Sequence, residues 1–192
     1  MTDDEAKTRH FSRVEYAKLI DLGIFQSGEA LELLDGEIIV AEPQTAPHYT
    51  AIQKTAKTLE KAFGPGWDVR TQGPIGLDDE SEPEPDVAVV AGSLEDYSRA
   101  HPSRPVLTIE VAESSLDVDR QHKGSLYARA GLTDYWVLNL VDRVLEVYRE
   151  PVADSAAPFG WRYGRSEVFS ADARVAPLAA PTTIIAIARL LP

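Results

Sequence analysis

Three segments decide the fold of this chain: PDVAVV at 85–90, VLTIEVAESS at 106–115 and DVDRQHKGSLYARAGLTDYWVLN at 117–139. The first two contain apolar runs of strand length, and the run 106–112 is apolar enough to be buried on both faces of a sheet. The third segment predicts a helix over about 117–130, closed by Gly131, and then a strand at 135–140. Strands and helices in this order indicate a sheet covered by helices.

The flanking sequence adds further elements. Ser12 and Glu15 form a capping box at the start of a helix, Asp35-Gly36 is a tight-turn signal between two apolar runs, and Pro47 opens a second helix. Beyond Pro151 the strand signals weaken, and an acid- and proline-rich stretch before Val87 reads as a solvated loop. The remaining expected elements are a helix over about 12–22, strands at 31–34 and 38–40, a helix over about 47–63, strands at 67–70, 87–90 and 144–149, a variable loop over 92–104, weak strand signals at Trp161, Tyr163, Val168 and Phe169, and a better one at 182–187.

Composition bounds the class of protein. A chain of 192 residues with 44% hydrophobic content predicts one domain over 1–192, with residues 1–10 as a flexible polar arm. The pattern is that of an α/β (α+β) protein with a mixed central sheet flanked by helices. There are no cysteines, which excludes disulfides, thiolate zinc sites and a cysteine nucleophile.

Charge and hydropathy bound the partners and the location. The formal net charge of −12 argues against a strongly basic, sequence-independent nucleic-acid binder, although local basic patches can coexist with an acidic whole. No apolar run approaches the roughly 18 residues that span a bilayer, and the charged first residues do not resemble a signal peptide. We therefore expect a cytoplasmic protein with no membrane partner.

Two acidic residues stand out against the apolar strands. Alternation places Glu110 on one face of its strand, where a carboxylate is costly unless it is paired, hydrogen-bonded or bound to a cation. Asp86 stands at the mouth of the preceding strand, from which its carboxylate could project toward the same place. Two carboxylates on neighbouring strands can hold Mg²⁺, which takes oxygen ligands and keeps several waters.

A lysine interrupts the apolar stripe of the helix that follows Glu110. At about 100° per residue, positions 116, 123, 126, 127 and 130 share one face, and only Lys123 among them is charged. A lysine pointed at the sheet could neutralise a scissile phosphate or orient an attacking water. Glu32, in the first hairpin, could lean toward the same centre or face water. His48 could be a ligand or a phosphate contact, or simply be packed at its helix start.

Each of these residues also has a structural interpretation. Asp86 could cap a turn before its strand. Glu110 could pair with Arg104 or Arg120 in an ion-pair network. Lys123 could make a surface pair with Asp119, four residues earlier on the helix. The local sequence leaves these alternatives open.

The segments taken together carry a resemblance. The pattern "PD, then EV followed by Ser, then D-x-x-x-K-x-x-x-Y-A-x-x-G, then YW", with the LELLDGEII hairpin and the Pro47-His48 helix start, resembles the Uma-two family of restriction-endonuclease-like proteins over roughly residues 11–150. This family is a branch of the PD-(D/E)XK nuclease superfamily. The resemblance implies a nuclease core in which Asp86, Glu110 and the backbone carbonyl of Val111 bind Mg²⁺ or Mn²⁺ and water attacks a phosphodiester.

The chain departs from the superfamily pattern at one position. Ala112 stands where D/E-x-K has its lysine, so the resemblance moves that role to Lys123 on the next helix. The leading hypothesis is a metal-dependent DNA endonuclease with Asp86, Glu110 and Lys123 as catalytic residues and Glu32 as an outer carboxylate. Its rivals are a non-catalytic binding module that retains the fold, and a hydrolase of RNA or smaller phosphoesters. Related enzymes that cut both strands are commonly dimers, which leaves a homodimer open.

Overall fold

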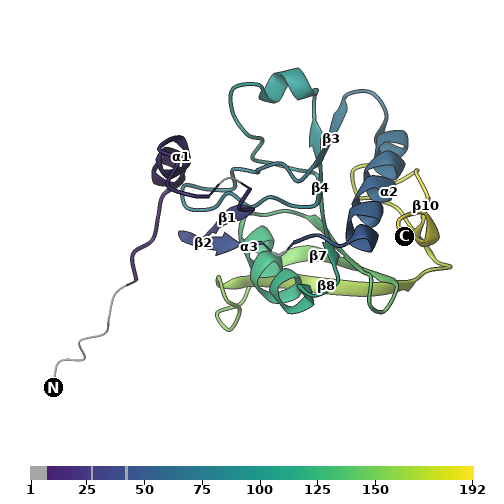
Figure 1. Ribbon diagram of the computed structural model, residues 1–192. Helices are drawn as coiled ribbons and strands as arrows, with labels where there is room; N and C mark the ends of the chain where they lie inside the picture. Colours follow the sequence, from purple (N-terminus) through teal and green to yellow (C-terminus); the bar gives the residue numbers. More distant parts are fainter. Residues whose placement is uncertain (1–7, 27, 42) are drawn as a thin grey trace.

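A six-stranded mixed sheet forms the centre of the protein (Figure 1). The computed structural model describes residues 8–26, 28–41 and 43–192. The strand order is β3-β4-β5-β6-β7-β8, with only the β5–β6 pair parallel. The expected mixed sheet is therefore confirmed. The strands are β3 (Trp67–Thr71), β4 (Val87–Ala91), β5 (Leu107–Ala112), β6 (Asp134–Asn139), β7 (Val144–Ala153) and β8 (Trp161–Ser170).

Helices cover both faces of this sheet. On one face α2 (Ala46–Phe63) packs on β4 and β5, and the C-terminal segment contacts α2 and adds to the same hydrophobic core (Figure 1). The Thr45 side chain caps α2, and a proline occupies its first turn, where no backbone N–H is needed. On the other face α3 (Gly124–Arg129) contacts β7 and β8.

The central strand β5 serves both cores. All six of its residues are buried. Leu107, Ile109 and Val111 belong to the core under α2, whereas Ala112 belongs to the core under α3. Because side chains alternate along a strand, Glu110 shares the face of Ala112 and points toward α3. The predicted alternation is confirmed, and it directs the Glu110 carboxylate toward the core under α3.

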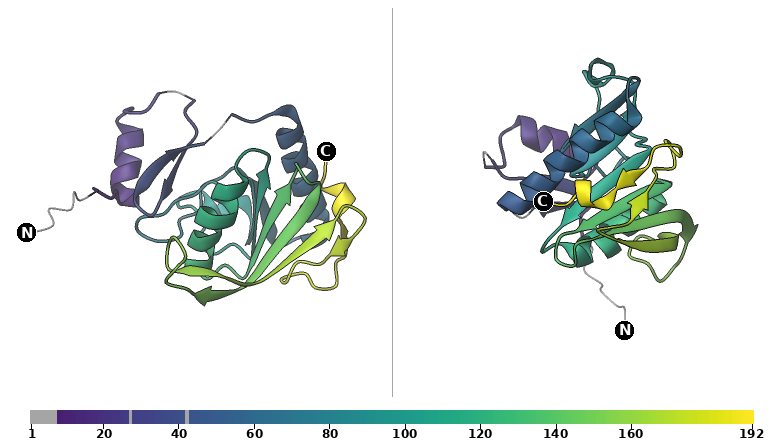
Figure 2. Two further views of the ribbon diagram at one scale, coloured as in Figure 1. Left: turned by 90° about the horizontal axis from the view of Figure 1, so that it is seen from below. Right: turned by 90° about the vertical axis from the view of Figure 1, so that its right-hand side faces the viewer.

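The N-terminal elements lie to one side of the sheet (Figure 2). They are α1 (Arg13–Asp21), which starts with the predicted Ser12 capping box, and the hairpin of β1 (Leu31–Leu34) and β2 (Glu37–Val40). Its turn has positive φ at Asp35 and Gly36, as a type I′ turn requires. Two backbone hydrogen bonds between Leu33 and Glu82 fasten the hairpin to the segment that leads into β4. Glu32 is thereby brought to the edge of the sheet.

The helix expected over 117–130 has two parts. Val118–Lys123 forms a π-helical turn (η2), and α3 follows it. The Asp119 carbonyl accepts the Gly124 N–H and also the Tyr135 hydroxyl at 2.9 Å. The tyrosine thus supports the wider turn, a tertiary contact that helical periodicity cannot reveal. Ala130, expected on the apolar stripe, is exposed.

Other expectations need correction. The weak signals at 161–169 belong to β8, a ten-residue strand stabilised by pairing along β7, whereas 182–187 supplies only the short strand β10 (Ile185–Ala186) and the start of the 3₁₀ turn η3 (Ile187–Arg189). β10 pairs with β9 (Arg174–Val175). Of the acid- and proline-rich stretch 78–86, residues 78–80 are exposed as expected, but 81–86 are not a solvated loop, because four of the six are buried. The loop 92–104 contains the 3₁₀ turn η1 (Leu94–Tyr97).

Two remaining expectations concern the N-terminal arm and the membrane. Of the arm, residues 1–7 lie outside the described residues, and residues 8–10 are exposed, with no helix or strand. No helix in the described part of the chain is long and apolar enough to cross a membrane.

Candidate functional site

A cavity of about 310 Å³ lies between the hairpin, the start of α2 and the ends of the inner strands β4 and β5. Its lining includes the hairpin residue Glu32, the α2 residue His48, and Asp86 and Glu110 from the sheet. The structure therefore brings every sequence-predicted site residue to one place. The acidic and basic side chains that line it are Glu32, Glu84, Asp86, Glu110, Glu113, Asp119, Lys123 and His48.

Asp86 and Glu110 are tied to each other through the backbone. Asp86 Oδ2 accepts the Val111 N–H at 2.8 Å, and the Asp86 N–H donates to Glu110 Oε2 at 3.3 Å. Both residues are buried, Glu110 to 3% exposure. Asp86 therefore bonds across to the neighbouring strand β5, and its interpretation as the cap of its own turn is wrong.

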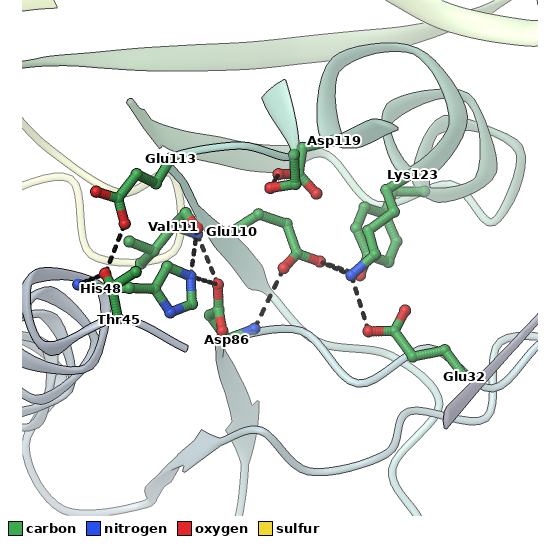
Figure 3. A network of polar contacts seen from close by, with 11 residues as sticks. Glu32, Thr45, His48, Asp86, Glu110, Val111, Glu113, Asp119 and Lys123 are labelled. Atoms are coloured by element: carbon green, nitrogen blue, oxygen red, sulfur yellow. Dashed lines mark hydrogen bonds and ion pairs between the residues drawn. The ribbon is translucent and has the colours of Figure 1, made fainter. Parts of the chain in front are cut away.

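Lys123 reaches the carboxylates from the helix side (Figure 3). Its Nζ donates to Glu32 Oε1 at 3.0 Å and to Glu110 Oε1 at 3.2 Å. The hydroxyl of Tyr127 donates to the same Glu110 oxygen at 2.7 Å. Lys123 is buried, so its interpretation as a surface partner of Asp119 is wrong.

The proposed arginine partners of Glu110 are also wrong. Arg120 instead makes two hydrogen bonds to Glu146, at 2.6 and 2.9 Å. In the described part of the chain, Arg104 makes no ion pair with Glu110.

Burial governs the electrostatics of the cluster. It raises the pKa of Glu110 well above its usual value. The positive charge of Lys123 lowers this pKa, but its effect is smaller than that of burial. The neighbouring carboxylates of Asp119, Asp86 and Glu32 raise the pKa further. Burial by itself lowers the pKa of Lys123, but Glu110, Glu32 and Asp119 together raise it above its ordinary value. The lysine stays charged in a site with an excess of acid, which is where an additional cation is stabilised.

His48 marks the point at which two oxygens converge. Its Nε2 lies 2.6 Å from the Val111 carbonyl oxygen and 3.3 Å from Asp86 Oδ2 (Figure 3). Burial lowers the pKa of His48, but the neighbouring Asp86 and Val111 carbonyl raise it on balance. Sequence analysis left the role of this residue open, and the structure places it against two of the three proposed ligands.

Three acidic members of the site escaped sequence analysis. Asp119 is buried, accepts the Ser115 hydroxyl at 2.5 Å, and has its pKa raised to about 6 by burial. Burial, with Glu32 and Glu82 nearby, raises the pKa of Glu84 to about 7. Glu113 accepts the Thr45 hydroxyl at 2.6 Å and joins the strand end to the start of α2. A signal for Asp119 was available, since it lies four residues before Lys123 on one helix face.

The donor set fits a hard divalent cation. Among the described residues, no three histidine, aspartate or glutamate side chains converge closely enough to hold an ion by themselves. The oxygen donors present at this point are the carboxylates of Asp86 and Glu110 and the neighbouring Val111 carbonyl, and such a set, completed by water, is of the kind that Mg²⁺ takes. The Val111 carbonyl oxygen and Asp86 Oδ2 are close to each other, because His48 Nε2 lies 2.6 Å from the first and 3.3 Å from the second.

A mixed sheet that presents an aspartate and a glutamate from adjacent strands to a lysine on the next helix defines a restriction-endonuclease-like protein. The model of the Uma2 family, described as "Putative restriction endonuclease", matches residues 13–185, and the chain belongs to this family. Its fold is similar to that of a solved protein from Anabaena variabilis ATCC 29413, described as "a putative nuclease belonging to DUF820", with a TM-score of 0.69 and 19% identity over 94% of this chain and 97% of that one. No curated protein matches the chain.

Proposed function

We propose that the protein is a Mg²⁺- or Mn²⁺-dependent endonuclease that hydrolyses phosphodiester bonds of DNA. The observation that carries this proposal is the hydrogen-bonded juxtaposition of Asp86, Glu110 and Val111, with the Val111 carbonyl and Asp86 Oδ2 both beside His48 and with Lys123 hydrogen-bonded to Glu110. Membership of the Uma2 family supports the nuclease class.

The metal would be held by Asp86 Oδ2, a Glu110 carboxylate oxygen and the Val111 carbonyl, with the His48 imidazole next to them. When bound, a divalent cation acidifies water and stabilises negative charge on the phosphate. Oxygen ligands suit Mg²⁺ and Mn²⁺, and an imidazole ligand would favour Mn²⁺ over Mg²⁺.

The chain's own residues orient the reacting groups. Lys123 is a fixed positive charge beside Glu110, and it would stabilise charge that develops on a phosphate oxygen. Tyr127 holds the Glu110 carboxylate by donating its hydroxyl, and Glu32 holds Lys123 from the opposite side. Glu32 thus acts as an outer carboxylate, positioning the lysine without a direct part in the chemistry.

The acidity of the site makes substrate binding depend on the cation. Six carboxylates and two basic side chains line the cavity, so a phosphodiester would be repelled until a divalent cation is bound. This accounts for a nucleic-acid substrate on a chain of net charge −12. A duplex cut on both strands needs two such sites, and for that substrate we expect a homodimer.

The test combines metal binding with cleavage. Supercoiled plasmid and single-stranded DNA are incubated with the protein at low salt, with Mg²⁺ or Mn²⁺, while the melting temperature is measured with and without Mn²⁺. The parent should nick DNA and melt higher with Mn²⁺. Glu110→Gln should lose both effects, whereas Lys123→Ala should lose cleavage and still respond to Mn²⁺.

Glu146→Gln is the matched control. Glu146 is as buried as Glu110 but bonds Arg120 outside the cavity, so this variant should keep the Mn²⁺ response even if it melts lower. A parent that binds Mn²⁺ and cuts no DNA would point to RNA or a smaller phosphoester. A parent that does neither would contradict the enzyme and favour a binding module.

A further inference from the structure

Five apolar residues also line the cavity beside the carboxylates, and the metal chemistry has no use for them. They are the hairpin residues Leu34, Ile39 and Val40, together with Pro43 and Val118, and we refer to them as the apolar half of the lining. Val40 is 65% exposed, and Ile39 and Val118 are exposed as well. Exposed apolar side chains gathered beside a polar site are typical of a ligand-binding surface.

We propose that this apolar half seats one unpaired nucleobase next to the scissile phosphate, so that the substrate is a single-stranded segment of nucleic acid and not a continuous duplex. The inference rests on the proposed function, because the acidic half must hold the phosphate through its cation. A nucleotide matches the two halves of the cavity, since it joins an apolar base face to an anionic phosphate.

The depth of the site favours an unpaired strand. Glu110 and Asp86 are almost fully buried, so the phosphate must enter the cavity to reach them. A volume of about 310 Å³ is near the lower end of the range of roughly 300–1,000 Å³ that small-molecule pockets show, which suits one nucleotide. A duplex is stiff, with a persistence length of about 150 base pairs, and bringing one of its phosphates into the cavity would require deformation or an extruded nucleotide.

Charge favours the same substrate. Affinity for a duplex backbone comes largely from lysine and arginine side chains that release counterions. Lys123 and His48 are the basic groups of the cavity in the described part of the chain, and both are already engaged with acidic partners. Binding of a single strand releases fewer counterions per phosphate contact than binding of a duplex, and contact of an unpaired base with apolar surface adds affinity that needs no cation.

Gln72 offers a polar contact beside the apolar surface. It is exposed at the cavity and has a φ of 50°, a left-handed conformation uncommon for a residue other than glycine. Its backbone N–H lies within hydrogen-bonding distance of the carbonyls of Pro85 and Asp86, which holds that conformation next to the proposed metal ligand. A glutamine amide both donates and accepts, as the polar edge of a base requires.

The test measures binding and cleavage of one sequence in several forms. The full-length protein with Mn²⁺ is mixed with labelled single-stranded DNA, single-stranded RNA and the corresponding DNA duplex, and binding is followed by fluorescence anisotropy. We expect the better single strand to bind at least tenfold more tightly than the duplex, and the comparison of DNA with RNA identifies the preferred sugar. Val40→Ser should weaken binding of that strand about three- to fivefold, because it removes apolar contact surface.

Val168→Ser is the matched control. Val168 is a strand valine that is 68% exposed and lies outside the cavity, so its replacement should leave strand binding unchanged. Equal affinity for the duplex and the single strand would contradict the proposed base-binding surface. Equal losses of single-strand affinity in Val40→Ser and Val168→Ser would contradict it as well.

The experiments distinguish failure of the proposed base-binding surface from failure of the proposed nuclease activity. If the duplex is cut as fast as the single strand, the base-binding surface is refuted, whereas the nuclease activity is confirmed. If nothing is cut and Mn²⁺ does not raise the melting temperature, the nuclease is refuted. The proposed base-binding surface is then refuted as well, because it needs the cation to hold the phosphate beside it.

Discussion

Replacing Lys123 by methionine removes one charge while keeping most of the side-chain volume. The ammonium bonds Glu32 Oε1 at 3.0 Å and Glu110 Oε1 at 3.2 Å, and all three residues are buried. Removing one partner of a buried ion pair costs about 3–5 kcal/mol, because the remaining charge has lost both water and partner. We expect Lys123→Met to lower the free energy of unfolding by about this amount at pH 8 in EDTA.

Urea denaturation provides the assay, with Lys57→Met as the control, because Lys57 is an exposed lysine of α2. The loss should be smaller at pH 5, where the Glu110 carboxyl, with a pKa already raised by burial, can take up a proton. In Glu32→Gln the loss from Lys123→Met should shrink by about 0.5–3 kcal/mol, as for groups in contact. A Lys123→Met variant as stable as Lys57→Met at pH 8 would refute the idea that this lysine holds the cluster together.

Three further predictions concern pH, backbone strain and metal preference. Asp119 has a pKa of about 6 in the folded chain and an ordinary value of 3.8, so the folded state binds more protons between these values and the free energy of unfolding falls as the pH rises through them. Asp119→Asn should flatten this part of the stability curve by on the order of 1 kcal/mol, and parallel curves for parent and variant in urea titrations would contradict it. Gln72→Gly should leave the melting temperature unchanged or raise it, because glycine adopts a φ of 50° without strain, and at the same time weaken strand binding; a large loss of stability would show that the side chain is structural. His48→Ala should lower Mn²⁺ affinity more than Mg²⁺ affinity in calorimetric titrations, since an imidazole suits Mn²⁺ better, and equal losses would exclude His48 as a ligand.

The sequence was informative where a local pattern decides the structure. Capping at Ser12, the turn at Asp35-Gly36 and the alternation around Glu110 are short-range features, and the structure confirms each of them. Alternation also showed that a carboxylate must face a core, which made Glu110 the firmest candidate.

The sequence failed where a distant residue decides. The π-helical turn before α3 depends on Tyr135, which bonds the Asp119 carbonyl from sixteen residues away. The long strand β8 depends on its pairing with β7, which local hydrophobicity does not encode. His48 meets the Val111 carbonyl across 63 residues, and the burial of Glu32 follows from the hairpin's attachment to Glu82.

The same packing explains why the lysine of this site is on a helix. Ala112, which occupies the place of the lysine in D/E-x-K, is fully buried and belongs to one apolar cluster with Tyr127 and Ala128 of α3. An ammonium at this position would lie inside that cluster, at a high desolvation cost. Lys123 is the last residue of the π-helical turn, just before α3, and its Nζ reaches Glu110. The apolar helix that covers the strand therefore excludes a charge at Ala112, and the charge comes instead from the residue just before that helix. A lysine introduced at Ala112 would not substitute for Lys123.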